Sequence, residues 1–287
     1  MGIVQLLING ILLGSVYAMT GLGMSIVFGI VGLTNLAHGE LIVLGAYAST
    51  LLAAVLGVDP ILCLAITAPF MFLFGYGLQV LLVNRAMKRG GEPALLVTFA
   101  LSIILQDGML LLFSADARHA AADYSSMIIR LGELDISLLN LILFVISLSC
   151  VALLTFFLKK SYTGRAIRAV ADDREAARLS GIKVGRVYAI AMGIATMTAA
   201  VAGTCVSLKW TFYPSSGGQY LLTAFLVVVI GGMDSIPGTL AAGLVFGMAQ
   251  VIGGAKYGLL ISYGVMLLAL VLRSRKMEWQ QDIAEQG

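Results

Sequence analysis

The sequence predicts an all-α membrane protein, a polytopic bundle of eight or nine membrane-spanning helices. Of its 287 residues, 60% are apolar and only 11% are charged, and the mean hydropathy is +0.99. An average soluble domain carries about 25% charged residues. The apolar runs are long and nearly continuous, as in residues 138–158. Strands of a membrane barrel would instead alternate apolar and polar residues. Long apolar runs therefore indicate helices.

The charge content excludes two other classes of protein. A disordered chain needs low hydrophobicity and high net charge, which is the opposite of this composition. A nucleic-acid-binding surface needs a concentration of basic residues. The net charge is only +3, from 18 Lys and Arg against 15 Asp and Glu. We therefore expect a lipid membrane around the protein and no nucleic-acid partner.

The individual spans follow from runs of roughly 17–25 apolar residues between polar breaks. The clear runs are 4–31, 36–57, 60–83, 94–114, 137–158 and 187–208. In the last third, Gly231-Gly232, Pro237 and Gly253-Gly254 divide the chain into 220–233, 238–253 and 257–273. Two of these segments are short for a full crossing, so we expect broken, tilted or re-entrant helices there. Residues 1–287 form a single transmembrane domain in this interpretation.

The orientation follows from Lys and Arg in the short loops, which favour the cytoplasm. Three basic segments are predicted to be cytoplasmic: Arg85, Lys88 and Arg89; residues 159–186, with eight basic residues; and the tail with Arg273, Arg275 and Lys276. Residues 115–135 are rich in Asp and Glu and belong outside, as does 209–219. Nine crossings satisfy these placements with the N-terminus outside and the C-terminus in the cytoplasm. Eight crossings would move one terminus to the other side.

A short sequence echo suggests an internal repeat. Gly14–Ala18 resembles Gly185–Ala189, with four identities in five residues. The two predicted spans that contain these segments run in opposite directions, as inverted repeats require. An inverted repeat is therefore a candidate organisation, although so short a match also arises by chance.

The charged loop 159–186 contains one predicted helix, Gly164–Ser180, which has good helix formers and no proline. Gly181 follows as a candidate C-cap. Such a short helix is marginal alone in water, so it needs a partner to pack against. The simplest interpretation is a solvated loop that obeys the positive-inside rule. The arrangement Glu175-Ala176-Ala177 with Gly181 points further, because it resembles the cytoplasmic loop by which ABC importer permeases dock on their ATPases.

Further segments extend that resemblance over nearly the whole chain. The chain is identified as similar to the branched-chain amino-acid ABC transporter permease family, in its LivH-like branch. The matching segments are Asn9-Gly10, Gly14–Ala18, Asn35–Glu40, Gly164-Arg165, Ala169–Asp172, Glu175–Gly181, Ala224-Phe225, Gly231–Met233 and Ile236–Gly238. Asp234 departs from the pattern, because a small residue is expected there.

The resemblance implies a transport subunit rather than an enzyme. Its implied partners are two cytosolic ATPase subunits, a second related permease chain or a copy of itself, and a periplasmic substrate-binding protein in the bacterial inner membrane system. The implied substrates are branched-chain or related amino acids, with urea, amides or another small solute as the alternative. The sequence has no G-x-x-x-x-G-K-[ST] phosphate loop, so any ATP is used by partner subunits, and no cofactor is expected. A proton-coupled secondary transporter is the alternative class.

The resemblance and the loop pattern give the candidate residues for ATPase coupling: Arg165, Asp172, Glu175, Ala176, Ala177 and Gly181. Ionisable groups inside spans are costly, which gives the pathway or gate candidates Asn35, His38, Glu40, Gln106 and Asp107. We expect His38 and Glu40 near the cytoplasmic end, as a gate or as the capped first turn of a helix. Asp107 is expected to meet a substrate ammonium group, another subunit or a wet vestibule.

One aromatic cluster has two interpretations. Trp210, Phe212 and Tyr213 follow the predicted span 187–208. An aromatic belt at the outer interface explains them best, and a cage for a cation is the alternative.

Overall fold

The computed structural model describes the backbone of residues 2–132 and 134–286, and the side chains of these residues except at 131, 255 and 272–286. The longer helices are α1 (Ile3–Val31), α2 (His38–Leu56), α3 (Leu64–Leu78), α5 (Gly91–Phe113), α6 (Leu138–Lys160), α9 (Val184–Lys209), α10 (Gly217–Gly231) and α11 (Ile236–Gln286). The shorter elements are a π-helical turn η1 (Gln79–Val83), α4 (Asn84–Met87), α7 (Tyr162–Asp172), α8 (Arg174–Leu179), the 3-10 turns η2 (Asp123–Ser126) and η3 (Pro214–Ser216), and strands β1 (Ile128–Leu131) and β2 (Leu134–Ser137).

The predicted bundle of membrane-spanning helices is confirmed. Within the described part of the chain, eight helical segments are long and apolar enough to cross a membrane, and Lys256–Val271 is a shorter apolar helix. The predicted break at Gly253-Gly254 is also correct, because Gly254 has non-helical angles (φ 66°, ψ −171°) inside α11. Beyond it the chain folds back on itself, since Ser262 Oγ donates to the Phe246 carbonyl at 3.1 Å. The difference between eight and nine segments lies in this return helix.

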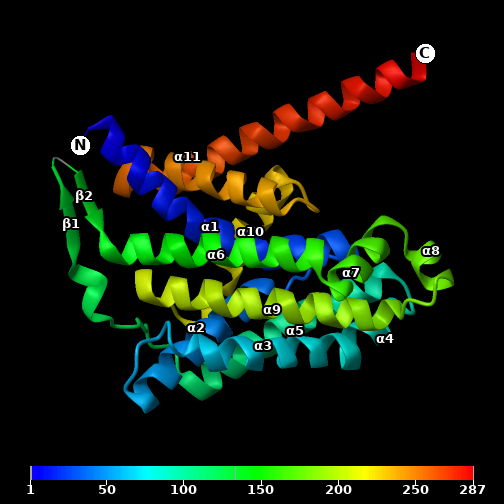
Figure 1. Cartoon of the computed structure of the whole chain (residues 1–287), viewed down its shortest axis with the longest axis horizontal. Helices are drawn as coiled ribbons and strands as arrows, with labels where there is room; N and C mark the ends of the chain where they lie inside the picture. Colours follow the sequence, from blue (N-terminus) through cyan, green and yellow to red (C-terminus); the bar gives the residue numbers. More distant parts are fainter. Residues whose placement is uncertain (1, 133, 287) are drawn as a thin grey trace.

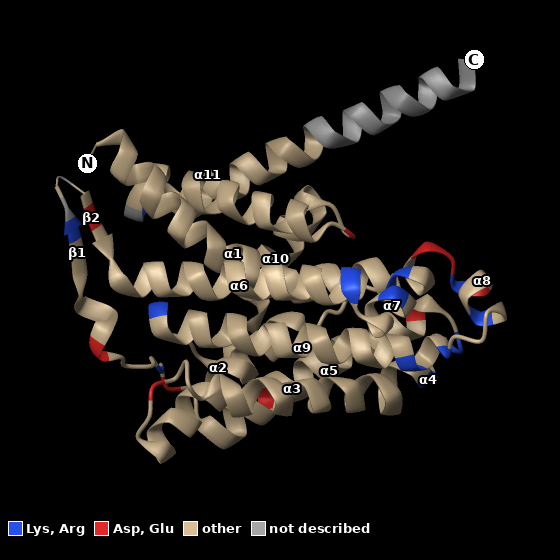
Figure 2. Cartoon of the chain, in the orientation of Figure 1, with Lys and Arg blue, Asp and Glu red and all other residues tan. Residues whose placement is uncertain are grey.

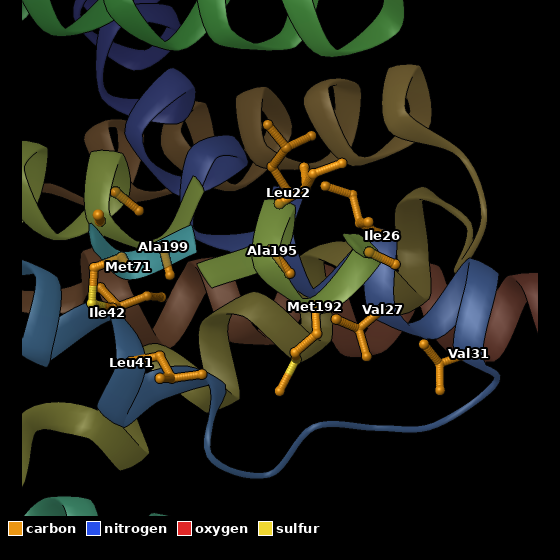
Figure 3. Packing of buried hydrophobic residues seen from close by; sticks show 14 of the residues in the cluster. Leu22, Ile26, Val27, Val31, Leu41, Ile42, Met71, Met192, Ala195 and Ala199 are labelled. Carbon is orange, nitrogen blue, oxygen red and sulfur yellow. The ribbon is translucent and has the colours of Figure 1, made fainter. Parts of the chain in front are cut away.

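Helices α1 and α9 form the centre of the bundle, as Figure 1 shows. Both are largely buried, whereas α5 and α6 expose most of their length. Their apolar residues point in all directions, as expected for helices that are surrounded by other helices. Leu22 and Ile26 of α1 pack against Met192 and Ala195 of α9 and the neighbouring α2 (Figure 3).

The two central helices run antiparallel. Val16 of α1 shares a cluster with Leu208 near the end of α9, while a Cβ at Gly23 would lie 2.6 Å from the Ala195 carbonyl oxygen. Each central helix is followed by an irregular segment and then by a helix, α2 or α10. A Cβ at Gly39 of α2 would overlap the carbonyl of Gly217 at the start of α10, so these two starts meet. This has the form of an inverted repeat.

The sequence echo does not follow the structural repeat. His38 and Gly217, which begin the two equivalent helices, are 179 residues apart in the numbering. Gly14 and Gly185 are only 171 apart, and they lie in the middle of α1 and in the first turn of α9. The echo is therefore out of register with the arrangement that it suggested.

Glycines bring α1 and α11 into close contact. A Cβ at Gly10 would lie 2.8 Å from Met248 Cα, and one at Gly14 would lie 2.5 Å from Leu244 Cα. Gly247 faces Gly14 from the opposite helix. Small residues four apart on both helices permit this close approach. It strengthens the van der Waals packing on which helix association depends in a membrane, because lipid is as apolar as the helix surfaces.

Most charged groups lie at the two ends of the bundle, as Figure 2 shows. At one end, here called the basic end, Arg85, Lys88, Arg174, Arg178 and Lys183 surround one cavity of about 850 Å³. The two predicted cytoplasmic loops thus share one end. The side chains of Arg273, Arg275 and Lys276 lie outside the described residues.

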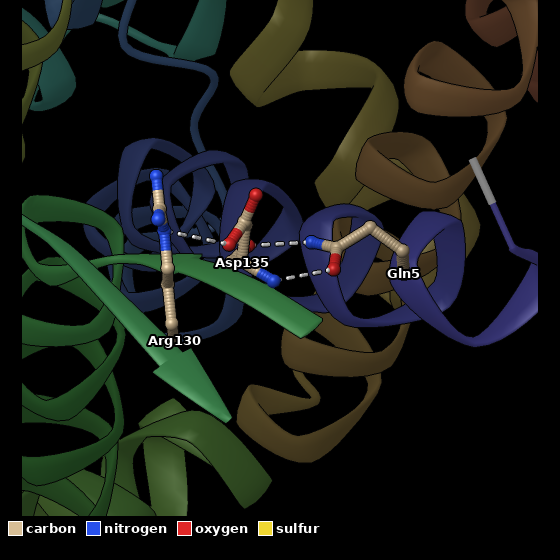
Figure 4. Close-up of polar contacts among 3 residues, drawn as sticks. All are labelled: Gln5, Arg130 and Asp135. Atoms are coloured by element: carbon tan, nitrogen blue, oxygen red, sulfur yellow. Dashed lines mark hydrogen bonds and ion pairs between the residues drawn. The ribbon is translucent and has the colours of Figure 1, made fainter. Parts of the chain in front are cut away.

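The opposite end, here called the hairpin end, carries the N-terminus and strands β1 and β2, which pair antiparallel. This hairpin is a local departure from the predicted all-α fold. Gln5 of α1 joins it by two hydrogen bonds with the backbone of Asp135, of 2.6 and 2.9 Å (Figure 4). Arg130 lies 3.7 Å from Asp135, but both side chains are exposed, so this ion pair adds little stability. Glu133, also predicted to lie outside, is not among the described residues.

Candidate functional site

The meeting of α2 and α10 inside the bundle is the first candidate site. Helix α2 starts at His38 after an irregular return, residues 32–37, from the end of α1. His38 reaches Thr20, eleven residues before Val31, so it lies roughly 16 Å from the end of α1 along the helix axis. The expectation that His38 and Glu40 lie near the cytoplasmic end is therefore wrong. The return segment carries the chain back into the bundle before the helix begins.

His38 ties the start of α2 to the middle of α1. Its Nε2 lies 2.9 Å from the Thr20 carbonyl oxygen, so Nε2 carries the proton and donates. Its ring packs over Gly23, where a Cβ would lie 2.7 Å from Cε1. The side chain is only 1% exposed. Nδ1 is buried and has no hydrogen-bond partner among the described residues.

Glu40 lies in the first turn of α2 and faces the first residue of α10. A Cβ at Gly217 would lie 2.6 Å from Glu40 Oε1, so a larger residue there would displace the carboxyl group. The carboxyl group also interacts with Ser102 of α5. Its Oε2 is buried without a partner within the described part of the chain. A carboxylate near a helix N-terminus is favoured by the helix dipole, which agrees with the first-turn interpretation.

Asn35 shapes the turn before α2 but does not cap the helix, because the N-cap residue is Ala37 and no side chain caps it. Its Oδ1 accepts from the backbone N–H of Ala37 at 3.1 Å, and its Nδ2 contacts Met192 Sδ of α9 at 3.7 Å. Thr98 Oγ1 of α5 accepts from the N–H of Leu36 at 3.3 Å. The return segment is therefore held by side chains of two other helices. Asn35, His38 and Glu40 all belong to this one junction.

The other two pathway candidates lie on α5, away from the junction. Gln106 is half-buried, whereas Asp107 is exposed. Asp107 stands among exposed apolar neighbours on the same helix face, Ile103, Ile104, Leu110 and Leu111. A carboxylate at the centre of a membrane span costs about 2.5–3.5 kcal/mol on insertion scales. This face therefore calls for a protein or water neighbour.

The predicted coupling helix is two helices. The single helix expected over Gly164–Ser180 is wrong, because the chain breaks at Asp173 between α7 and α8. Asp173 has extended angles, and its Oδ1 accepts from the N–H groups of Glu175 at 2.8 Å and Ala176 at 3.0 Å. An aspartate that satisfies free N–H groups is a favoured N-cap, so the carboxylate starts a new helix.

Gly181 ends α8 as predicted. It adopts φ +84°, and the N–H of Ile182 reaches back to the Ala177 carbonyl at 3.0 Å. This pairing is the usual glycine-terminated helix end. Of the predicted coupling residues, Arg165, Asp172, Glu175, Ala176 and Gly181 are exposed, whereas Ala177 is buried against the bundle. The two alanines therefore face opposite ways. Leu179 is 89% exposed, the most exposed of the large apolar side chains among the described residues.

Arg174 connects α8 to the central helices, and the sequence pattern did not single it out. Its guanidinium donates to the carbonyl of Val31, the last residue of α1, at 3.4 Å. It also lies 5.3 Å from the ring centroid of Tyr188 in α9. Because these partners are more than ten residues away in the chain, only the folded structure reveals the link. A displacement of α8 would act directly on α1 and α9.

Asp234 occupies the turn between α10 and α11. A Cβ at Gly29 of α1 would lie 3.0 Å from Asp234 Cα. Asp234 also lines a cavity of about 180 Å³ with Arg168 and Asp172 of α7. The residue that departs from the expected pattern thus lies beside the coupling helices.

Comparisons with known proteins agree with this architecture. The family model described as "Branched-chain amino acid transport system / permease component" matches residues 6–272. A high-affinity branched-chain amino acid transport system permease protein, BraD of Pseudomonas aeruginosa, is 30% identical over 94% of this chain and 93% of its own.

Two further relatives carry similar names. LivH of Salmonella typhimurium is 31% identical over 93% of this chain and 92% of its own. LivM of Escherichia coli, also a permease protein of such a system, is 27% identical over 90% of this chain and 66% of its own. The family model covers nearly the whole length of the bundle. The chain belongs to the branched-chain amino acid transport system permease family, a family of membrane transport components.

Proposed function

We propose that this chain is the transmembrane permease subunit of an ATP-driven importer for branched-chain or related amino acids. The relatives BraD and LivH are named as permeases of high-affinity branched-chain amino acid transport systems. The observation that carries the proposal is the α7–α8 loop at the basic end, which presents an exposed helix and links it to the centre of the bundle. Alternating access is powered by separate ATPase subunits, two in number.

The ATPases dock on α8 in this proposal. Glu175, Ala176 and Leu179 are exposed on this helix, and Arg178 adds a positive charge. An exposed leucine beside charged groups suits a groove on a soluble partner. Arg174 then passes the movement to Val31 and Tyr188. The basic end lies in the cytoplasm by the positive-inside rule, which places the N-terminus outside and the C-terminus in the cytoplasm of a bacterial inner membrane.

A second permease covers the Asp107 face of α5. One carboxylate within an exposed apolar face is costly in lipid and acceptable in a protein interface or a wet pathway. The second subunit is a related chain or a copy of this one, and the relative LivM is a second named permease of such systems. A periplasmic binding protein delivers the solute at the hairpin end.

The test is uptake of radiolabelled L-leucine into proteoliposomes that contain the assembled importer and its binding protein. We expect uptake to require ATP on the side of the membrane that carries the ATPase subunits, and to continue in the presence of a protonophore. Glu175→Ala and Gly181→Ala should lower uptake at least about tenfold, because each changes the docking helix or strains a positive φ. The matched controls are Glu92→Ala and Gly91→Ala, a glutamate and a glycine in the first turn of α5.

The alternative class and the alternative substrates give different results in this assay. A proton-coupled transporter that uses His38 and Glu40 would stop with the protonophore, would lose activity in Glu40→Gln and would tolerate Glu175→Ala. A urea or amide system would retain ATP dependence but would take up those solutes and not L-leucine. Protonophore-sensitive uptake without ATP would overturn the leading proposal.

A further inference from the structure

A small cavity opens beside the start of α10, near the hairpin end. Its volume is about 210 Å³, and its lining includes Tyr17, Trp210, Tyr213, Ser216, Tyr220 and Gln250. A single buried water needs only about 10–15 Å³. The cavity therefore has room for a small solute. It lies at a broken helix between repeats, a common setting for transporter binding sites.

The wall of this cavity suits a positively charged group. The rings of Tyr17 and Trp210 lie 5.7 Å apart, centroid to centroid, and two further tyrosines complete the aromatic lining. Aromatic faces attract ammonium groups by about 0.5–2 kcal/mol each. Phe212, the third member of the predicted aromatic cluster, is instead buried against Tyr47. The sequence cluster thus divides between packing and a cavity wall.

Gln250 supplies a free acceptor in this wall. Its side chain hydrogen-bonds the Tyr17 hydroxyl. Its Oε1 is buried and has no partner among the residues that the structure describes. Buried polar atoms in native proteins nearly always have a partner, so this oxygen calls for a donor. An ammonium or amide N–H of a bound solute would satisfy it.

A second cavity, of about 520 Å³, shares Gln250 and contains a cation. Lys209 Nζ lies 2.5 Å from Asn140 Oδ1 and 5.5 Å from the centroid of the Trp210 ring. Within the described residues Lys209 forms no ion pair, and Asp135 on the same wall pairs with Arg130. A half-buried lysine with only a neutral partner favours an anion beside it.

We propose that these two cavities form one binding site for a small zwitterion, with its ammonium at Gln250 Oε1 and its anionic group beside Lys209. Gln250 lines both cavities, and Lys209 of the second cavity lies 5.5 Å from the Trp210 ring of the first, so one small ligand spans the two polar groups. The assignment of an amino acid as the ligand rests on the proposed function. A phosphatidylethanolamine headgroup has the same pair of charges, with phosphate in place of carboxylate, and the experiment separates these sources.

The experiment compares variants of the full importer in liposomes of phosphatidylcholine and phosphatidylglycerol. The readouts are uptake of labelled L-leucine and ATP hydrolysis at saturating binding protein. Gln250→Leu and Lys209→Met should each lower uptake at least about tenfold, the equivalent of one lost hydrogen bond to a charged group. ATP hydrolysis should remain at the wild-type rate. A docking or folding defect would instead lower both uptake and ATP hydrolysis. Gln250→Glu keeps the acceptor and should retain uptake.

The matched control is Lys256→Met, an exposed lysine that lines neither cavity. Size-exclusion chromatography checks assembly. If Gln250→Leu does not assemble, the separate variants Lys209→Met and Gln250→Glu are compared instead. If Gln250→Leu and Lys209→Met both take up L-leucine at the wild-type rate, the proposed site is wrong and the proposed function is unaffected. A wild-type importer that takes up no amino acid overturns the proposed function and the amino-acid ligand with it.

Lipid composition distinguishes the two sources of the zwitterion. If an amino acid binds, wild-type uptake is the same with and without phosphatidylethanolamine. If the headgroup binds, wild-type uptake requires phosphatidylethanolamine, and mass spectrometry finds this lipid retained by the wild type and lost from Gln250→Leu. That second result would overturn the amino-acid assignment.

Discussion

Two glycines set the distance between α2 and α10. A Cβ at Gly39 would overlap the backbone carbonyl of Gly217, and a Cβ at Gly217 would displace the carboxyl group of Glu40. The charged side chain is thereby held against helix backbone. Close contacts at these two glycines therefore determine how the starts of α2 and α10 meet.

Gly39→Ala should separate these helices. The added methyl group would overlap the Gly217 carbonyl, and overpacking in a filled interior costs about 1–3 kcal/mol. We expect a lower unfolding temperature in detergent and reduced L-leucine uptake. Gly218→Ala is the control in the same turn, since nothing lies within 4 Å of its added Cβ. It should be neutral or stabilise α10 by up to about 1 kcal/mol. Equal effects of the two substitutions would contradict this view of the junction.

At the scale of elements, the long helices were predictable because each crosses the bundle as one apolar run. The predicted run 137–158 became α6 (Leu138–Lys160), and the break at Gly254 was recognisable from its paired glycines. The predicted run 36–57 placed the start of α2 within two residues of His38, but it did not predict how deep in the bundle that start lies. Residues 32–37 return the chain into the bundle, and the residues that hold this segment, Thr98 and Met192, are distant in the sequence.

The candidate site divides in the same way. Gly181 and the exposed Glu175 were evident from a local pattern, because the helix end needs a residue that tolerates positive φ. The break at Asp173 was not predicted because good helix formers surround it. The helix breaks there because the Asp173 side chain accepts hydrogen bonds from two N–H groups at the start of α8. Arg174 and Gln250 act on partners distant in the sequence, so no local pattern identifies them.

The cap at Asp173 gives a prediction for α8 as an element. Asp173→Ala removes the acceptor of two backbone N–H groups and should destabilise the helix by about 1 kcal/mol. A six-residue helix without its cap should fray, so ATPase subunits should bind more weakly. Asp173→Asn keeps an N-cap acceptor and should restore most of the binding. Affinity of the purified ATPase for the permease in nanodiscs measures both. Equal losses in Ala and Asn variants would indicate that charge, rather than capping, matters.

At the scale of the whole molecule, the inverted arrangement shapes the centre of the bundle, and the two ends differ in the segments that they carry. Each central helix leads to a partner that begins inside the bundle, so irregular backbone lies at the protein centre, where other helices satisfy it. The hairpin end gathers β1, β2 and the segment after α9, which pairs with Arg118 through Phe212. The basic end gathers α4, α7 and α8.

This separation predicts which end faces the cytoplasm. Ala121 lies in the loop at the hairpin end and Ser180 at the end of α8, and both are exposed. We expect Ala121→Cys to react with a membrane-impermeant maleimide on intact spheroplasts, and Ser180→Cys to react only after permeabilisation. The native cysteines should react little with the maleimide, because Cys63 and Cys205 are buried and Cys150 is half-buried. The positive-inside rule requires this result, since the basic residues lie at the α8 end. The reverse labelling would invert the topology and remove α8 from reach of a cytosolic ATPase.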